Sequence, residues 1–196
     1  MADDRDLVRR MQLGERRAFE EFIDSYGGRV HRLVRSHVSN PCDAEDLTQE
    51  IFCDLYRCIG KFRGEAALGT WVYRVAMNHC LKHRQRAKPE CLPYDEAIAE
   101  TEVDHRCDPA RSAEQSELKD RVTGALDRLS AAHRDVVILH ELHGLTYQEC
   151  AGVLGVPVGT VKSRLSNAFN RLRVLLGGYI LGEAGPMTAD TIAGRL

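Results

Sequence analysis

The sequence lacks any apolar run long enough to cross a bilayer. Its longest run, Val136 to Leu139, is far shorter than the roughly 20 residues that a membrane-spanning helix needs. No apolar signal segment opens the chain, and the seven cysteines are odd in number and form no C-x-x-C pair. We therefore expect reduced thiols, a cytoplasmic protein and no direct membrane insertion.

Signatures of enzymes and of β structure are also missing. The chain shows no catalytic triad, no glycine loop of the kind that cradles phosphates, no strand-like alternation and no internal repeat. Its 196 residues are enough for two small domains, each with its own core. Because every apolar pattern has a helical period, we predict an all-α protein made of two small helical domains.

Charge is nearly balanced overall but unevenly distributed. The formal net charge is −2, yet two stretches, 71–88 and 156–182, carry cations and no carboxylate. An acidic connector separates them, with Glu90, Asp95, Glu96, Glu100, Glu102, Asp104 and Asp108. Two basic surfaces on either side of a linker are expected when two modules bind one polyanion.

The most informative stretch runs from Leu145 to Leu165 and reads as a helix-turn-helix. Thr146 and Glu149 have the spacing of a capping box, Gly155 can end the first helix with a positive φ, and Pro157 suits the start of the second. The apolar stripe of the second helix is Val161, Leu165, Ala168, Leu172 and Leu175, and we expect Gly177-Gly178 to end it. Its other face carries short polar and cationic side chains suited to a major groove: Thr160, Lys162, Ser163, Ser166 and Asn167. An ordinary helical hairpin with a solvated polar face is the alternative.

The N-terminal third predicts three further helices. Apolar residues at a helical period predict the first helix over Phe19 to Val34. The second helix is expected to start after Asn40-Pro41, with Asp43 as its cap, and to end at Gly60. An ordered loop, 61–70, then leads to a third helix over 71–86 that we expect Thr70 to cap. Residues 89–113 have little periodicity and form a linker. A helix over 131–143, capped by Ser130 and ended by Gly144, precedes the helix-turn-helix, and the tail 178–196 is expected to be loose.

The helix over 71–86 has the composition that single-stranded DNA binding requires. Trp71, Arg74, Asn78 and Lys82 follow each other at three- and four-residue steps, and the preceding loop adds Phe62 and Arg63. Cations can bind phosphates, while aromatic faces or pockets can receive unstacked bases. Trp71 and Phe62 can equally be core residues, and for Trp71 alone burial is the more common outcome.

Four segments occur in an order that identifies a family. They are Asp43 to Phe52 (DAEDLTQEIF), Phe62 to Glu65 (FRGE), Thr70 to Asn78 (TWVYRVAMN) and Val156 to Arg164 (VPVGTVKSR). Together they resemble bacterial extracytoplasmic-function (ECF) sigma factors of RNA polymerase, over about Leu7 to Leu176. The resemblance implies a sigma-2-like domain (1–88), a linker (89–113), a sigma-4-like domain (114–177) and a tail (178–196). It also implies no enzymatic chemistry, no cofactor and no metal.

The same resemblance assigns surfaces to residues. Contact with the clamp helices of the polymerase β′ subunit is implied for Glu45, Asp46, Gln49 and Glu50. Contact with the melted minus-ten element is implied for Phe62, Arg63, Trp71, Arg74, Asn78 and Lys82. Contact with the minus-thirty-five element is implied for Thr160, Lys162, Ser163, Arg164, Ser166 and Asn167.

Further partners follow from the family. They are the β flap of core RNA polymerase, promoter DNA, and an anti-sigma factor that can hold the protein at the membrane and govern a stress or envelope-signal regulon. Two departures bear on these assignments. Ser166 and Asn167 stand where relatives often carry larger or basic side chains, and the sequence after Asn78 lacks the commoner Asp- and Arg-rich pattern.

Two other classes of protein compete with this interpretation. His79, Cys80 and His83 lie within one turn, and His140 with His143 forms H-E-x-H. These residues suggest a metal enzyme or a metal sensor as an alternative. H-E-x-H lacks the four-residue spacing that directs two imidazoles at one zinc. A conventional dimeric repressor or activator would use the same helix-turn-helix, but it leaves the N-terminal motifs unexplained.

Overall fold

The computed structural model describes residues 4–87 and 121–180, and within these ranges the regular structure is entirely helical. The N-terminal part contains α1 (Asp4–Gln12), α2 (Arg16–Arg35), α3 (Pro41–Cys58), the 3₁₀ turn η1 (Ile59–Lys61) and α4 (Leu68–Ala87). The C-terminal part contains α6 (Ala131–Val137), the π-helical turn η2 (Ile138–Leu142), α7 (Tyr147–Leu154) and α8 (Val158–Ile180). Residues 121–127 are also helical. The predicted all-α fold with two helical domains is confirmed; the predicted linker and most of the tail lie outside the described residues.

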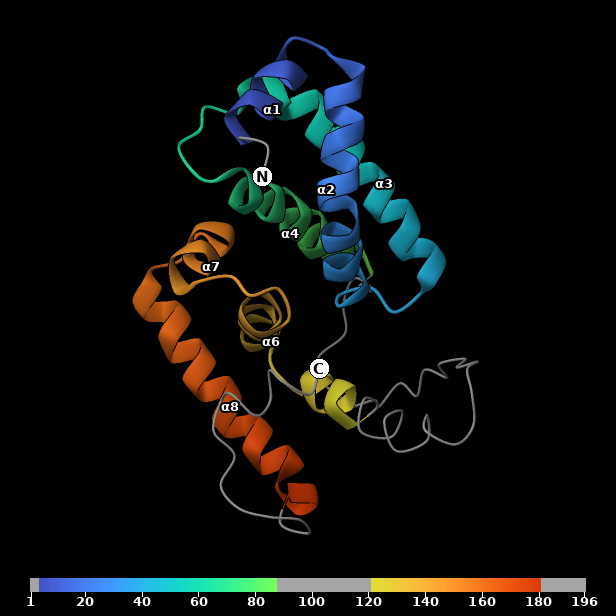
Figure 1. The fold of residues 1–196 in the computed structure, drawn as a ribbon. Coiled ribbons are helices and arrows are strands. Elements are labelled where there is room, and N and C mark those ends of the chain that lie inside the picture. Colours follow the sequence, from blue (N-terminus) through green and yellow to red (C-terminus); the bar gives the residue numbers. More distant parts are fainter. Residues whose placement is uncertain (1–3, 88–120, 181–196) are drawn as a thin grey trace.

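In the N-terminal part, α2, α3 and α4 pack pairwise against one another, and α1 lies on α2 (Figure 1). The fully buried side chains that join them include Phe22 and Leu33 of α2, Ile51 and Leu55 of α3, and Val72 of α4. Helix α1 was not predicted from the sequence. It is fixed to α2 by Arg10, whose guanidinium contacts Glu15 and Glu21 at 3.0 Å each.

Three predicted helix ends are wrong. Helix α3 is capped by Asn40, whose side chain accepts a hydrogen bond from the Cys42 amide at 2.9 Å, and not by Asp43. Helix α4 starts at Leu68, so Thr70 lies inside its first turn, because burial of Leu68 draws that turn into the core. Helix α8 continues through Gly177-Gly178 to Ile180, since Gly177 does not adopt a positive φ.

The helix predicted over 131–143 lies close to its predicted ends. Ser130 is the residue before α6, although its side chain makes no capping hydrogen bond. Beyond Val137 the helix widens into the π turn, in which the His143 amide donates to the Ile138 carbonyl at 3.2 Å, and Gly144 then ends the helix with φ +67°. Within and just after this turn, Leu139 is buried and His143 contacts Tyr73 of the N-terminal part.

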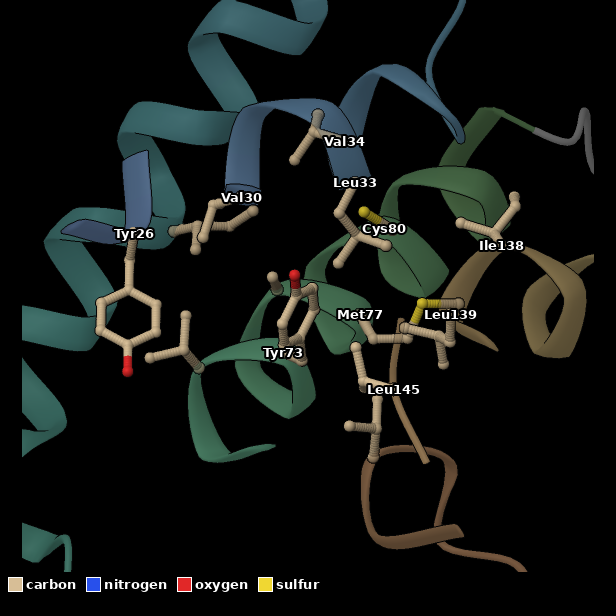
Figure 2. Close-up of a cluster of buried hydrophobic side chains, with 14 of the residues drawn as sticks. Tyr26, Val30, Leu33, Val34, Tyr73, Met77, Cys80, Ile138, Leu139 and Leu145 are labelled. Atoms are coloured by element: carbon tan, nitrogen blue, oxygen red, sulfur yellow. The ribbon is translucent and has the colours of Figure 1, made fainter. Parts of the chain in front are cut away.

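The two parts share one continuous apolar core. Figure 2 shows Leu33 of α2 and Met77 and Cys80 of α4 beside Ile138, Leu139 and Leu145 of the C-terminal part. Met77 and Leu139 are almost completely buried. Helix α4 thus lies between its own bundle and α7, as Figure 1 also shows.

Candidate nucleic-acid interface

Helix α4 carries the side chains predicted to contact single-stranded DNA. Arg74, Asn78 and Lys82 are exposed along one face, whereas Val72 and Ala76 are buried against the bundle. Trp71 is only half-buried and packs on Phe62, with ring centroids 5.2 Å apart. The two rings therefore pack on each other and still leave part of their aromatic surface exposed on the molecule.

The loop before α4 is held by a residue that the sequence analysis did not single out. The side-chain amide of Gln12, at the end of α1, donates to the carbonyls of Ile59 and Phe62, at 3.0 Å each. Gly64 then turns the loop with φ +74°, and Arg63 is exposed beside it. A fixed loop of this kind presents Phe62 and Arg63 at the N-terminal end of α4.

Helix α3 presents Glu45, Asp46, Gln49 and Glu50 on its exposed side. Asp46 and Glu50 line a groove of about 330 Å³ between α3 and α4, and Lys82 and Arg86 line it from the other side. Within the groove Nε2 of His79 lies 2.8 Å from the Asp54 carboxylate. The surfaces predicted to bind polymerase and DNA therefore adjoin across one groove of mixed charge.

The helix-turn-helix has the local geometry that the sequence predicts. Thr146 and Glu149 form a complete capping box: the Thr146 hydroxyl accepts from the Glu149 amide, and the carboxylate accepts from the Thr146 amide at 2.8 Å. Gly155 ends α7 with φ +66°, and α8 begins immediately after Pro157. Val161 and Leu165 are buried, which fixes the rotation of α8 about its axis.

On the opposite face of α8 the predicted recognition residues lie together. Lys162, Ser163, Ser166 and Asn167 are exposed, and Thr160 and Arg164 are half-buried. The ammonium of Lys162 lies 5.7 Å from the centre of the Tyr147 ring at the start of α7. Ser163 donates its hydroxyl to the Thr160 carbonyl at 3.0 Å, so its oxygen remains free to accept.

Not every cation of the 71–88 stretch is free for a polyanion. Arg84 contacts both oxygens of Asp135, at 3.2 and 3.4 Å, and Nε2 of His37 contacts the same carboxylate at 3.2 Å. Burial would raise the pKa of Asp135, but the hydrogen bonds and charges of His37 and Arg84 outweigh it and lower that pKa. Periodicity offers no signal for this contact, because 98 residues separate His37 from Asp135.

The histidines and cysteines considered as metal ligands are dispersed. Cys80 is buried, and burial raises the pKa of its thiol to about 12, so it is a core residue rather than a thiolate. Nδ1 of His140 contacts the Leu145 carbonyl, whereas His143 faces Tyr73. Across residues 4–87 and 121–180 no three His, Cys, Asp or Glu side chains converge as a metal site.

Two family models match the chain at the parts described above. Sigma-70 region 2 matches residues 22–90, and Sigma-70 region 4 matches residues 119–172. The RNA polymerase sigma-H factor of Pseudomonas aeruginosa is 34% identical over 172 residues, which are 84% of this chain and 89% of the relative. The chain belongs to the ECF sigma factors of the sigma-70 family.

Other relatives agree with this assignment. The ECF sigma-E factors of Haemophilus influenzae and Escherichia coli are 34% and 33% identical, each covering 84% of this sigma factor and 90% of the relative. The sigma factor RpoE of Bartonella quintana, solved with the anti-sigma factor NepR, has a TM-score of 0.61 at 25% identity and covers 81% of this chain and 96% of its own. CnrH, solved with the cytosolic domain of CnrY, shares the fold with a TM-score of 0.69 at 24% identity, over 89% and 97% of the two chains.

The predicted surfaces map onto the two matched regions. Helices α2, α3 and α4 belong to region 2, and the helix-turn-helix belongs to region 4. In the described part of the chain no helix is both long enough and apolar enough to cross a membrane.

Proposed function

We propose that this sigma factor binds core RNA polymerase, directs it to a promoter and opens the DNA there, without enzymatic chemistry of its own. The observation that carries the proposal is the pairing, in one chain, of an aromatic and cationic face on α4 with a recognition helix α8. The first suits unstacked bases and the second suits duplex DNA. A repressor that reads only duplex DNA would not need the first surface.

Membership of the family supports a role for each of these surfaces. The acids and amide of α3, Glu45, Asp46, Gln49 and Glu50, contact the β′ clamp helices. Phe62, Arg63, Trp71, Arg74, Asn78 and Lys82 bind the melted minus-ten strand. Thr160, Lys162, Ser163, Arg164, Ser166 and Asn167 bind the minus-thirty-five duplex, and region 4 also contacts the β flap.

The neighbours solved as complexes support an anti-sigma partner in the cytoplasm, because the Bartonella quintana relative was solved with the anti-sigma factor NepR. Such a partner, itself soluble or membrane-bound, would keep this sigma factor from polymerase until a stress or envelope signal releases it. Co-purification with the product of a neighbouring reading frame, and loss of transcription on adding that product, would test this part.

Reconstituted run-off transcription tests the main proposal. Core polymerase is incubated with genomic promoter fragments, with and without the purified chain. We expect promoter-specific transcripts only when the chain is present. Specific transcripts from core polymerase alone, or none on any fragment with the chain added, would exclude the proposed function.

A further inference from the structure

We propose that Gln12 is a positioning residue for minus-ten recognition: it anchors the loop 62–67 in the conformation in which that loop reads a base of the melted strand. Its role in reading rests on the proposed function, which takes Phe62 and Arg63 as minus-ten residues. Its anchoring of the loop does not. Sigma-70 region 2 matches residues 22–90, so Gln12 and all of α1 lie before the matched region.

The anchor is a pair of hydrogen bonds from one side chain. Nε2 of Gln12 donates to the carbonyl of Ile59 and to the carbonyl of Phe62, at 3.0 Å each. A primary amide has two N–H donors, so these two carbonyls use both of them. The Ile59 carbonyl also accepts from the Phe62 amide at 3.0 Å, which closes the η1 turn. Gln12 therefore fixes the backbone at the point where η1 passes into the loop.

Gln12 is itself held at a defined place on the molecule. The three apolar side chains of α1 are buried, which fixes the rotation of this helix about its axis, and α1 contacts η1 directly. Just after Gln12, Gly14 adopts φ +80° and the Glu15 amide donates back to the Arg10 carbonyl at 3.1 Å. A side chain on a helix with a fixed end can position a loop more accurately than one on another loop.

The loop between η1 and α4 depends on this anchor. Residues 62–67 form no regular structure, and Gly64 turns them with φ +74°. A Cβ at Gly64 would meet no atom within 4 Å, so the backbone conformation, and not a lack of space, requires glycine there. Within the described chain, Gln12 is the one residue whose side chain makes a hydrogen bond to residues 62–67.

The anchor is connected to the aromatic surface at the start of α4. The carbonyl that Gln12 holds belongs to Phe62, whose ring packs on Trp71 with centroids 5.2 Å apart. Arg63, the next residue, is exposed. A displacement of the backbone at Phe62 therefore moves both an aromatic ring and a cation. A loop that already has its bound conformation loses less conformational freedom when an unstacked base enters.

Two substitutions at Gln12 separate the hydrogen bonds from the helix that carries them. Q12M places a methyl group where Gln12 has its amide nitrogen, so both hydrogen bonds are lost at nearly unchanged size. Q12K supplies three N–H donors on an arm one bond longer and should restore the contact with the carbonyls. Methionine, lysine and glutamine have similar helix propensities, so neither change weakens α1. R9A truncates another exposed side chain of α1 and is the matched control.

Fluorescence tests the anchoring without DNA or polymerase. Trp71 is the only tryptophan of the chain, and it packs on the ring of Phe62. In Q12M we expect Phe62 to move away from Trp71, so that the emission shifts to longer wavelength and acrylamide quenches it more strongly. Q12K and R9A should match the wild type. Identical emission and quenching for Q12M and the wild type would overturn the anchoring.

Selection from a randomised minus-ten library, with core polymerase, tests the role in reading. R63A first identifies the position whose base preference depends on the loop. At that position we expect Q12M to reduce the preference for the best base by about tenfold, as for the loss of two hydrogen bonds. Q12K should restore it, and R9A should leave it unchanged. A merely destabilised protein would use every promoter less and leave this ratio unchanged, because a smaller folded fraction scales all promoters equally.

Failure of this inference differs from failure of the proposed function. An unaltered minus-ten preference in Q12M, or no position that responds to R63A, would overturn the role in reading. Equal losses in Q12M and Q12K would overturn the hydrogen bonds as the cause. If the wild-type chain supports no promoter-specific transcription, the proposed function fails and the role in reading fails with it, while fluorescence still decides the anchoring.

Discussion

The hydroxyl of Tyr73 on α4 lies 3.1 Å from Nδ1 of His143, which caps η2. The two rings meet edge to face, with centroids 5.3 Å apart. Burial, together with the nearby charges of Arg32 and His37, lowers the pKa of His143 to about 4. His143 is therefore neutral in the folded chain at physiological pH, and it contacts Tyr73 without placing a charge between α4 and η2.

Stability should decrease as the pH falls below about 6.5. The pKa of His143 is lower in the folded chain than its ordinary value of about 6.5, so the unfolded state binds the extra proton first. The stabilisation is fully present above pH 6.5 and is lost as the pH falls toward 4. A single group changes the free energy of unfolding by at most about 1.4 kcal/mol per pH unit, and partial exposure reduces this value. Urea unfolding at pH 7.5, 6.5 and 5.5 measures it.

H143N is the matched control. Asparagine can accept a hydrogen bond from the Tyr73 hydroxyl, but it cannot take up a proton. The variant should be less dependent on pH than wild type over the same interval. Identical profiles for the two proteins would mean that His143 does not titrate between these limits.

Strand opening should depend on Asn78, which is exposed on α4. N78A removes an exposed amide that touches no other described side chain by hydrogen bond, so stability should change by less than about 0.5 kcal/mol. Core binding should be unchanged, and open-complex formation should fall. Permanganate reactivity of melted thymines is the measurement, with Q85A, another exposed polar residue of α4, as the control. Unchanged thymine reactivity in N78A would remove Asn78 from the minus-ten surface.

The capping box should contribute measurably to region 4. In T146A the Glu149 amide loses its acceptor and the carboxylate loses the hydroxyl donor at 2.7 Å. Loss of an N-cap typically costs about 1 kcal/mol. Thermal unfolding compares T146A with T123A, the same change at an exposed helical site. Equal melting temperatures for the two variants would show that α7 does not depend on its cap.

Local signals explain why the helix-turn-helix could be predicted so completely. Thr146, Glu149, Gly155 and Pro157 act within a few residues of one another, so their geometry is determined by the sequence between them. Thr70 shows the limit of this reasoning. It has the chemistry of a cap, but burial of Leu68 extends α4 past it, and Trp71 instead donates its amide to Ala67 at 3.1 Å.

The contact of Asp135 in region 4 with His37 and Arg84 in region 2 could not be predicted, because it depends on residues far apart in the chain. The carboxylate of Asp135 meets Arg84 across 51 residues and His37 across 98, and none of the three stands out in a local pattern. For the same reason, the sequence does not show which cations of the basic stretch 71–88 remain available to a nucleic acid. Only tertiary packing separates Arg84, which binds Asp135, from Lys82, which stays exposed.

The recognition face of α8 can be tested residue by residue. Lys162 has an exposed ammonium near Tyr147, and if it neutralises one phosphate, K162A should weaken all promoters about equally and lower the salt slope by about one unit. Ser163 and Asn167 are short and exposed, so if either reads a base, its alanine variant should change preference at one position by about 1–3 kcal/mol. Selection from a randomised minus-thirty-five library measures both effects. N170A, on the same helix, serves as the control. An unaltered consensus for S163A and N167A, with an unaltered salt slope for K162A, would mean that α8 contacts DNA through a different face.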